Sequence, residues 1–504
     1  MINQTVTAEE TLAGKYSRLE SDREIFLSNA EAASKLTIPM LFSRTPGAKR
    51  FPSPYQSVGA RGLNNLSAKI LLALLPANTP FYRFGVDDES MAQLAADAAQ
   101  AEQINMGFAR VERTMQTNIE SSLLRPKLSE AVKQLLLSGN ALVHIEDLDK
   151  IRVFKLTNYV VSRDGSGTML DTIVKEVVNP RTLKTEIAEA CGVDTRDTKT
   201  DVELFTGIAL DGEHYKIYQE INDKLVPGSE GSYPKDKLPW LPLRFFSVDG
   251  ESYGRGYIEE YIGDLKSLEG LSKSVVQAAA ASAKVLFLIR NGITDKRALA
   301  AARNGDFVNG DVNDVGVLQV NKFADMRVAQ EAAAKIEQRL ELAFLMNTSI
   351  QRNGERVTAE EIRLMAQELE DGLGGIYSLL SHELQRPLVS VILAALQKRK
   401  VLPQFPKDVM KVSITTGLEA LGRGQDALKL QQVASDVIAL GPVAQQKVNM
   451  GVLLTRLIVA RGVDTTGLIK TPEEELAEQQ QQMAMEVGKA AGPDLVRGAM
   501  GSPQ

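Results

Sequence analysis

The chain has little cysteine, few aromatic side chains and no long hydrophobic run. Cys191 is the only cysteine among 504 residues, which excludes a disulfide framework within the chain and is typical of a reducing cytoplasm. We interpret it as a small packing residue. No apolar stretch approaches the ~20 residues of a membrane span, and the polar, acidic N-terminal segment predicts no signal peptide. We therefore expect a protein without disulfides and without a membrane partner.

Signatures of catalysis are also missing. The sequence contains no G-x-x-x-x-G-K-S/T loop for nucleotide phosphates, no G-x-S-x-G, no H-E-x-x-H and no C-x-x-C. The G-R-G segments at 254–256 and 422–424 are interpreted as turns. The histidines are too scattered to suggest a metal site, and they are His144, His214 and His382. We expect no cofactor, no metal, no catalytic residue and no enzymatic activity.

One acidic cluster keeps an enzyme open as an alternative. Its members follow Thr358 closely and are Glu360, Glu361, Glu368, Glu370 and Asp371. Carboxylates of this kind could serve a metal-dependent nuclease or a transferase. However, Glu361 stands three residues after Thr358 and completes a capping box, and the others spread around the expected helix opposite an apolar stripe. A solvated or inter-subunit face is the favoured interpretation.

The net charge of −6 bounds the kind of nucleic-acid contact that we expect. Tight, sequence-specific DNA binding usually needs a basic surface, which this composition does not indicate. An acidic balance is compatible with a channel through which DNA slides, because a strongly attracting wall would hold the polymer in place. The charge therefore argues against a specific DNA-binding protein and not against a conduit.

Two periodicities organise the first half of the chain. Apolar positions at helical spacing predict helices over 8–35, 57–75, 97–121 and 127–138. From Ala141 the period changes to two, which predicts a series of strands with a last one at 239–248. Residues 1–250 should thus form one α+β domain with a largely antiparallel sheet, in a chain long enough for further domains.

A stalk with a tip is predicted next. One helix starts near Arg255 and runs for about 29 residues, roughly 43 Å at 1.5 Å per residue. Short strands and a short helix follow over 285–330, including a strand at 326–330, and a second helix runs from about Glu331 to Met346. Small residues near the end of the first helix allow close approach between copies of the chain, and they are Ala278, Ala279, Ala280 and Ala281.

A polar segment at 347–356 is expected to be a loop whose arginines could contact phosphate. The helix after it begins at the N-cap Thr358, contains three glycines between 372 and 375, and should bend there or at Pro387. The pattern then predicts a strand, a glycine turn and a helix start over 411–426, helices at about 425–440 and 442–460, and a helical tail that frays into disorder.

Three long blocks carry a resemblance to a known family. They are SVGARGLNNLSAKILLAL (57–74), DGESYGRGYIEEYIGDLKSLEGL (249–271) and QRNGERVTAEEIRLMAQELEDGLGGIYSLLSHELQRPLV (351–389). Together with TIPMLF (37–42) and ITTGLEALGRGQD (414–426), they resemble the portal (head-to-tail connector) proteins of the short-tailed, T-seven-like bacteriophages, the podoviruses. The similarity spans about 25–470, nearly the whole chain.

This resemblance implies a mainly helical α+β portal fold that assembles as a ring of twelve around a DNA channel at one capsid vertex. The implied parts are a wing (1–254 and 359–417), a stem (255–284 and 331–346), a clip (285–330), a tunnel loop (347–358), a crown (418–470) and a C-terminal tail (471–504). The implied role is to nucleate procapsid assembly, to conduct the genome during packaging and ejection, and to attach the tail.

The resemblance also implies partners and a location. The implied partners are other copies of the chain, double-stranded DNA without sequence specificity, the terminase large subunit, tail adaptor proteins, the major capsid and scaffolding proteins, and internal core proteins. The protein would be part of the virion after assembly in the bacterial cytoplasm. A cellular helical scaffold without a DNA role is a further alternative, but it would not explain two helices that carry a β tip.

Three sets of residues are the candidate functional positions. DNA contact in the tunnel loop is assigned to Asn347, Thr348, Gln351, Arg352 and Arg356. Inter-subunit packing in the stem is assigned to the four alanines named above. Docking of an acidic partner on the clip is assigned to Lys296, Arg297 and Arg303.

Overall fold

The computed structural model divides the chain into two compact units. One unit comprises Met1–Arg356 with Leu364–Gly417, and the other comprises Val357–Arg363 with Leu418–Gln504. The structure describes residues 10–45, 47, 50–76, 80–86, 98–196, 200–282, 286–290, 294–318, 323–346, 379–402, 410–414, 430–441, 448, 451, 453–454 and 457–458.

Four α-helices occupy the start of the chain, as the periodicity predicts. They are α1 (Leu12–Leu36), α2 (Val58–Leu74), α4 (Ala98–Ser121) and α5 (Leu124–Ser138). Their apolar faces build the main core, in which Leu63, Leu66 and Leu74 are completely buried. The short 3-10 helix η1 (Pro39–Leu41) follows α1. Within the part of the chain that the structure describes, every helix is too short or too polar to cross a bilayer.

The strands that follow are antiparallel, as predicted, but they form two sheets where one was expected. A three-stranded sheet has the order β10 (Trp240–Arg244), β2 (Asn140–Asp147), β3 (Lys150–Phe154). A six-stranded sheet runs from β4 (Tyr159–Arg163) through β5 (Met169–Val178), β6 (Val202–Asp211) and β7 (His214–Ile221) to β8 (Lys224–Leu225), with β9 (Gly231–Pro234) also on β7. The division occurs at η2 (Leu156–Asn158), a 3-10 turn that redirects the chain after β3.

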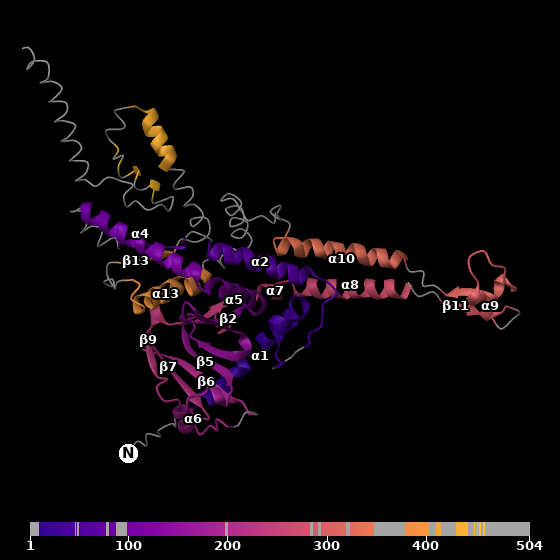
Figure 1. The fold of residues 1–504 in the computed structure, drawn as a ribbon, viewed down its shortest axis with the longest axis horizontal. Helices are drawn as coiled ribbons and strands as arrows, with labels where there is room; N and C mark the ends of the chain where they lie inside the picture. The colour runs from indigo at the N-terminus through magenta and orange to yellow at the C-terminus, as the bar shows by residue number, and fades with distance from the viewer. Residues whose placement is uncertain are drawn as a thin grey trace, which may run out of the picture. The chain divides into compact units, whose positions relative to one another are not determined.

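Helix α1 covers the six-stranded sheet (Figure 1). Its residues Leu12, Tyr16 and Leu19 pack on Val160, Ile173 and Phe205 of β4, β5 and β6. The short helices η3 (Pro180–Thr182), α6 (Thr185–Cys191) and η4 (Lys235–Lys237) connect the strands of this region. Cys191 is 1% exposed within a small apolar cluster, which agrees with its interpretation as a packing residue.

A strand from late in the chain returns to pair with an early one. Strand β1 (Tyr82–Val86) is antiparallel to β13 (Met410–Ile414), with Phe84 opposite Val412. The two segments that the resemblance assigns to the wing are therefore joined by backbone hydrogen bonds. The sequence predicted a strand at the start of 411–426 but did not predict its partner β1.

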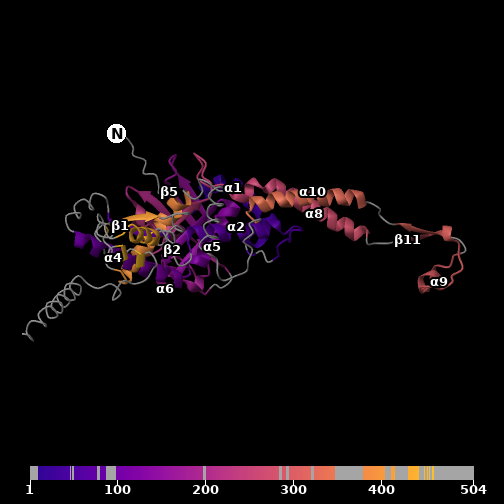
Figure 2. The same cartoon turned by 90° about the horizontal axis from the view of Figure 1, so that it is seen from above.

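The stem forms as two helices that lie side by side in both views (Figure 1 and Figure 2). The first is interrupted at Tyr261, which separates α7 (Tyr257–Glu260) from the 21-residue α8 (Ile262–Ser282), so the prediction of one helix of about 29 residues was wrong. The interruption coincides with a tertiary contact, because the Tyr261 ring lies 5.9 Å from that of Phe344, just after α10.

The second stem helix is longer than predicted. Helix α10 spans Phe323–Ala343, so the strand predicted at 326–330 is helical. That stretch holds a single β-branched residue, Val328, among good helix formers, and Arg327 forms an i,i+4 ion pair with Glu331. Local helix propensity therefore continues the helix toward the tip.

The tip and the C-terminal segments complete the described chain. The tip holds β11 (Leu286–Ile289) antiparallel to β12 (Val315–Leu318), with α9 (Lys296–Ala301) and η5 (Val312–Asp314) between them. Near Pro387 a π-helical turn, η6 (Ser381–Gln385), precedes α13 (Arg386–Lys398), which confirms an irregularity at this proline. In the second unit, residues 430–439 are helical, within the helix predicted at 425–440.

A partly buried histidine should make stability depend on pH. His144 of β2 stacks on Trp240 of β10 with 3.7 Å between ring centroids, and burial, together with the nearby Arg152, lowers its pKa from 6.5 to about 4. Between pH 6.5 and pH 4, the His144 side chain is protonated in the unfolded chain but mostly neutral in the folded chain. The free energy of unfolding therefore falls as the pH is lowered from 6.5 toward 4. The loss should reach ~2 kcal/mol at pH 5.

The measurement is thermal unfolding at pH 7 and pH 5 for the natural protein and for His144→Gln. The variant should lose this part of the pH dependence, while His214→Gln, at an exposed position, should retain it. Identical pH dependence of His144→Gln and the natural protein would contradict the assignment to His144.

Candidate assembly and docking surfaces

The described residues hold no constellation for metal chemistry. Among them, no group of three histidine, cysteine, aspartate or glutamate side chains could hold a metal ion. The carboxylates at 360–371, on which the enzyme alternative depends, lie outside the described residues.

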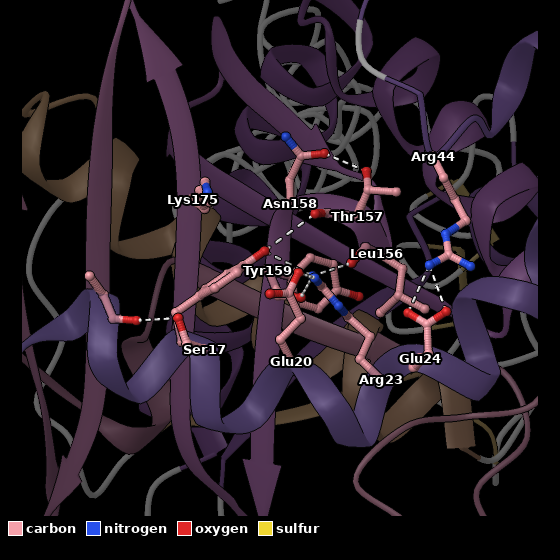
Figure 3. A network of polar contacts seen from close by, with 12 residues as sticks. Ser17, Glu20, Arg23, Glu24, Arg44, Leu156, Thr157, Asn158, Tyr159 and Lys175 are labelled. Carbon is pink, nitrogen blue, oxygen red and sulfur yellow. Dashed lines mark hydrogen bonds and ion pairs between the residues drawn. The ribbon is translucent and has the colours of Figure 1, made fainter.

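The most deeply buried charged side chain among the described residues has a structural role (Figure 3). Arg23 of α1 is 1% exposed, and its Nη1 donates to Tyr16 Oη (3.0 Å) and to the carbonyl oxygens of Leu156 (2.8 Å) and Tyr159 (2.7 Å). Its Nη2 donates to Glu20 at 2.8 Å. These bonds tie α1 to η2 and to the start of β4, although the buried Arg23 Nε has no hydrogen-bond partner among the described residues. The network therefore fixes the fold rather than presenting a binding site.

Among the described residues of the two stem helices, only those near the base are fully buried. Leu265 and Leu268 are the only fully buried residues of α8, all of which the structure describes. On the side of α10, Leu340 and the following Phe344 are completely buried. Arg339 Nη2 of α10 lies 2.8 Å from Asp264 Oδ1 of α8. Beyond this base, a single chain leaves most of the stem surface open.

The predicted packing alanines lie on that open part of α8. Ala278 is half-buried, while Ala279, Ala280 and Ala281 are exposed in the single chain. The neighbouring Val276 is 51% exposed, and Val328 of α10 is 67% exposed. Small and apolar side chains at these positions are what close packing of helices from different copies requires. Such packing stays a prediction.

The base of the stem is held by side chains that cap the end of α10. From α7, Tyr257 Oη donates to the carbonyl oxygen of Ala343 (2.8 Å). From α2, Asn65 Nδ2 donates to the carbonyl oxygens of Phe344 (2.9 Å) and Leu345 (3.0 Å). Lys69 Nζ, also on α2, donates to the carbonyl oxygen of Leu345 (2.8 Å). The last carbonyls of a helix lack partners within the helix and carry its negative dipole end, so amide, hydroxyl and ammonium donors satisfy them. The chain thus enters the segment after Met346 from a fixed point.

Close contact at this base explains the glycine at position 62 in the sequence block at 57–74. A Cβ atom on Gly62 of α2 would lie 2.4 Å from the Phe344 ring, so only glycine permits the observed approach. Sequence reasoning placed Asn65 and Lys69 on α2 but could not assign their roles. Their acceptors are backbone carbonyls more than 270 residues later in the chain, and no local sequence pattern predicts a contact over that distance.

The tip presents the predicted charges and an apolar group that the prediction missed. Lys296, Arg297 and Arg303 are all exposed. Phe307 is 105% exposed and Val312 is 90% exposed. The missed signal was two large apolar residues inside a segment of glycine, asparagine and aspartate, where a turn should be polar.

The predicted DNA-contacting residues cannot be placed. Asn347, Thr348, Gln351, Arg352 and Arg356 lie outside the described residues. The structure reaches Met346 at the start of this segment and resumes at Leu379. Their assignment stays a prediction.

Comparison with known proteins gives the family. A family model described as bacteriophage head to tail connecting protein matches residues 9–469. The portal proteins of Escherichia phage T7 and Enterobacteria phage T3 are each 40% identical over 504 aligned residues, covering 97% of this chain and 94% of each relative. The portal protein of Pseudomonas phage phiKMV is 30% identical over 484 residues, covering 92% of this chain and 93% of the relative. With both the helical stem and these near end-to-end matches, the chain belongs to the bacteriophage head-to-tail connecting proteins and, within them, to the T7-like portal proteins.

Proposed function

We propose that this chain assembles into a ring of about twelve copies at one vertex of a phage capsid, where it surrounds the channel for double-stranded DNA. The genome enters through this channel during packaging and leaves through it during ejection. The ring also nucleates procapsid assembly and later attaches the tail. The observation that carries the proposal is the near end-to-end match to T7-like portal proteins, together with a two-helix stem whose outer part lacks burial in one chain.

Each region has a proposed task. The tip docks the terminase large subunit during packaging and tail adaptor proteins afterwards. The wing contacts the major capsid and scaffolding proteins, and internal core proteins join inside the capsid. The protein acts in the virion after assembly in the host cytoplasm, and its role is structural rather than enzymatic.

The mass of the purified protein tests the ring. Size-exclusion chromatography with light scattering should show a species of about twelve copies of the 55.0 kDa chain. A heterologous interface that closes on itself gives a discrete ring, so one sharp mass is expected rather than a ladder. A protein that remains a monomer or dimer over the whole concentration range would contradict the proposal.

Charge reversal at the tip should weaken docking of the motor. Arg297→Glu with Arg303→Glu replaces two exposed cations by anions, which should lower affinity for the terminase large subunit by ~tenfold or more at physiological salt. The ring itself should stay intact, because both side chains are exposed on the tip. Binding is measured with immobilised rings.

The matched control reverses two exposed cations of the wing, Arg181→Glu with Lys184→Glu. The control rings should bind the terminase as the natural rings do. Unchanged binding of the tip variant would remove Arg297 and Arg303 from the docking surface.

Shortening the loop at 349–355 should leave rings normal and reduce the amount of retained DNA. Repetition around the ring would place about twelve Arg352 guanidiniums near the channel, and each contact with phosphate is screened over ~8 Å at physiological salt. Many weak contacts can hold DNA transiently without fixing it. The readouts are ring mass and genome length in purified particles.

Single substitutions separate charge from chain length. Arg352→Lys keeps the charge and should retain DNA, whereas Arg352→Gln should retain less. If particles with the shortened loop package and keep full-length DNA, then the segment is only a connector.

A further inference from the structure

A buried ion pair joins the returning helix to the three-stranded sheet. Glu383 of η6 accepts two hydrogen bonds from the Arg244 guanidinium at its Oε1, from Nε (2.9 Å) and Nη2 (2.6 Å), and one from the Arg244 backbone N–H at its Oε2 (2.8 Å). The two side chains are only 10% and 11% exposed. The pair thus links β10 to a segment that lies far along the chain.

A second arginine belongs to the same cluster. Arg163, at the end of β4, donates to three neutral carbonyls, those of Pro242 (2.7 Å), Gly167 (2.9 Å) and Ser252 (3.2 Å). Burial lowers the pKa of Arg163, Glu383 raises it, and the positive charge of Arg244 lowers it further. Glu383 therefore contacts the buried Arg244 directly and acts electrostatically on the partly buried Arg163.

Gly167 shows how closely the two guanidiniums approach. Its carbonyl accepts from Arg163 Nη1, and a Cβ atom added to it would lie 3.0 Å from Arg244 Nη2. Gly167 lies in the turn between β4 and β5, with φ of +87°. Three separate elements, the turn of the six-stranded sheet, β10 and η6, consequently meet at this cluster.

The carboxylate comes from an unusual backbone. In η6 the Arg386 N–H bonds the carbonyl of Ser381, five residues earlier, instead of the usual four. Pro387 explains part of this, because proline in a regular helix has no N–H to give and its ring clashes with the carbonyl of the residue four before it, here Glu383. Single π turns are rare and often mark functional positions.

Pro387 accounts for the irregular turn but not for its orientation relative to the rest of the fold. Its direction is set by two side chains that point into the fold, Glu383 toward Arg244 and Gln385, whose Nε2 donates to the carbonyl of Leu74 at 2.8 Å. Gln385 is 1% exposed, so this contact also lies inside the protein.

We propose that Arg163, Arg244 and Glu383 form a charge lock that holds the turn Ser381–Gln385 in its π register against β10. Withdrawing Glu383 would leave the buried Arg244 and the partly buried Arg163 without this carboxylate, which is costlier than exposing an ordinary surface pair. The lock therefore fixes the direction in which the chain enters α13. It does not depend on the proposed function, although that function places the DNA-contacting loop earlier on the same returning chain.

Hydrogen exchange of the purified full-length protein tests the lock without any partner. Glu383→Gln keeps the shape of the side chain and removes its charge, and the amides of residues 381–386 should then exchange about tenfold faster or more. The control is Arg399→Gln, which removes the exposed pairs of Arg399 with Asp147 and Asp149 at the other end of α13. It should leave exchange at 381–386 unchanged, and an unchanged rate in Glu383→Gln overturns the proposal.

Removing one arginine tests whether Glu383 serves both. Arg244→Met leaves one cation beside one carboxylate, so exchange should be slower than in Glu383→Gln, which leaves two cations. If Arg244 were the only partner of Glu383, its removal would loosen the turn at least as much. Exchange in Arg244→Met equal to or faster than in Glu383→Gln would therefore exclude Arg163 from the lock.

A variant that keeps all three charges gives an independent test. Gly167→Ala would press on the Arg244 guanidinium and should accelerate exchange at 381–386. Gly212→Ala is the control, since Gly212 also has a positive φ (+60°) in a turn but nothing within 4 Å of an added Cβ. Circular dichroism verifies that each variant is folded. Equal exchange at 381–386 in the two alanine variants would overturn the coupling through Gly167.

Discussion

Replacing Ala280 by leucine should abolish the ring while leaving the fold of the chain intact. Ala280 is exposed on α8 in the single chain, so a larger side chain there meets no neighbour within that chain. Between copies it would separate helices that need small side chains to approach, at a cost of ~1–3 kcal/mol for each overpacked site. That cost recurs at every interface of the ring. Native mass spectrometry measures the assembly, and circular dichroism measures folding.

The same substitution on another exposed helix is the matched control. Ala190→Leu lies on α6, outside the stem, and should leave both the ring and the melting temperature unchanged. Rings of normal mass and stability in Ala280→Leu would show that this face of α8 does not pack between copies.

Replacing Gly139 by alanine should destabilise the fold by ~4 kcal/mol, at the upper end of what single substitutions do. Gly139 ends α5 with φ of +75°, which non-glycine residues adopt at a cost. A Cβ atom there would also lie 2.4 Å from the Gly254 carbonyl oxygen and 2.4 Å from the Arg255 carbonyl carbon. Both are backbone atoms, so the clash cannot be relieved by a side-chain rotation.

Gly212→Ala separates backbone strain from the clash. It has the same left-handed conformation, with φ of +60°, in open space, so only the conformational cost of ~1 kcal/mol should appear. Both variants are compared by chemical unfolding. Equal losses of stability would mean that the close approach of 139 and 254 contributes nothing.

The G-R-G segment at 254–256 shows how far a local motif can be read. Its interpretation as a turn was wrong, because Arg255 forms an isolated antiparallel β-bridge with Phe246, while Gly254 packs on the backbone of Gly139 and exchanges two hydrogen bonds with the Asn140 side chain. The sequence could not indicate that partner. Arg255 lies over the Phe26 ring at 4.7 Å and bridges Glu251 and Glu259, which makes it a structural tie at the start of the stem.

Local pattern was enough for most elements of the chain. Apolar residues at helical spacing determined α1, α2, α4 and α5, and alternation determined the strands β2 to β7 and β10, because each pattern reflects which side of one element must leave water. The long blocks of unusual sequence likewise determined the portal family, which nearly end-to-end similarity confirms.

Only the tertiary structure decided which elements meet. The division into two sheets, the pairing of β1 with β13 and the meeting of Arg163, Arg244 and Glu383 join residues far apart in the chain. The interruption at Tyr261 similarly coincides with a contact to Phe344. Periodicity reports how a segment divides between core and solvent. It carries no information about which distant segment supplies the other side of a hydrogen bond, a packed ring or a buried charge, and these contacts exist only once the whole chain has folded.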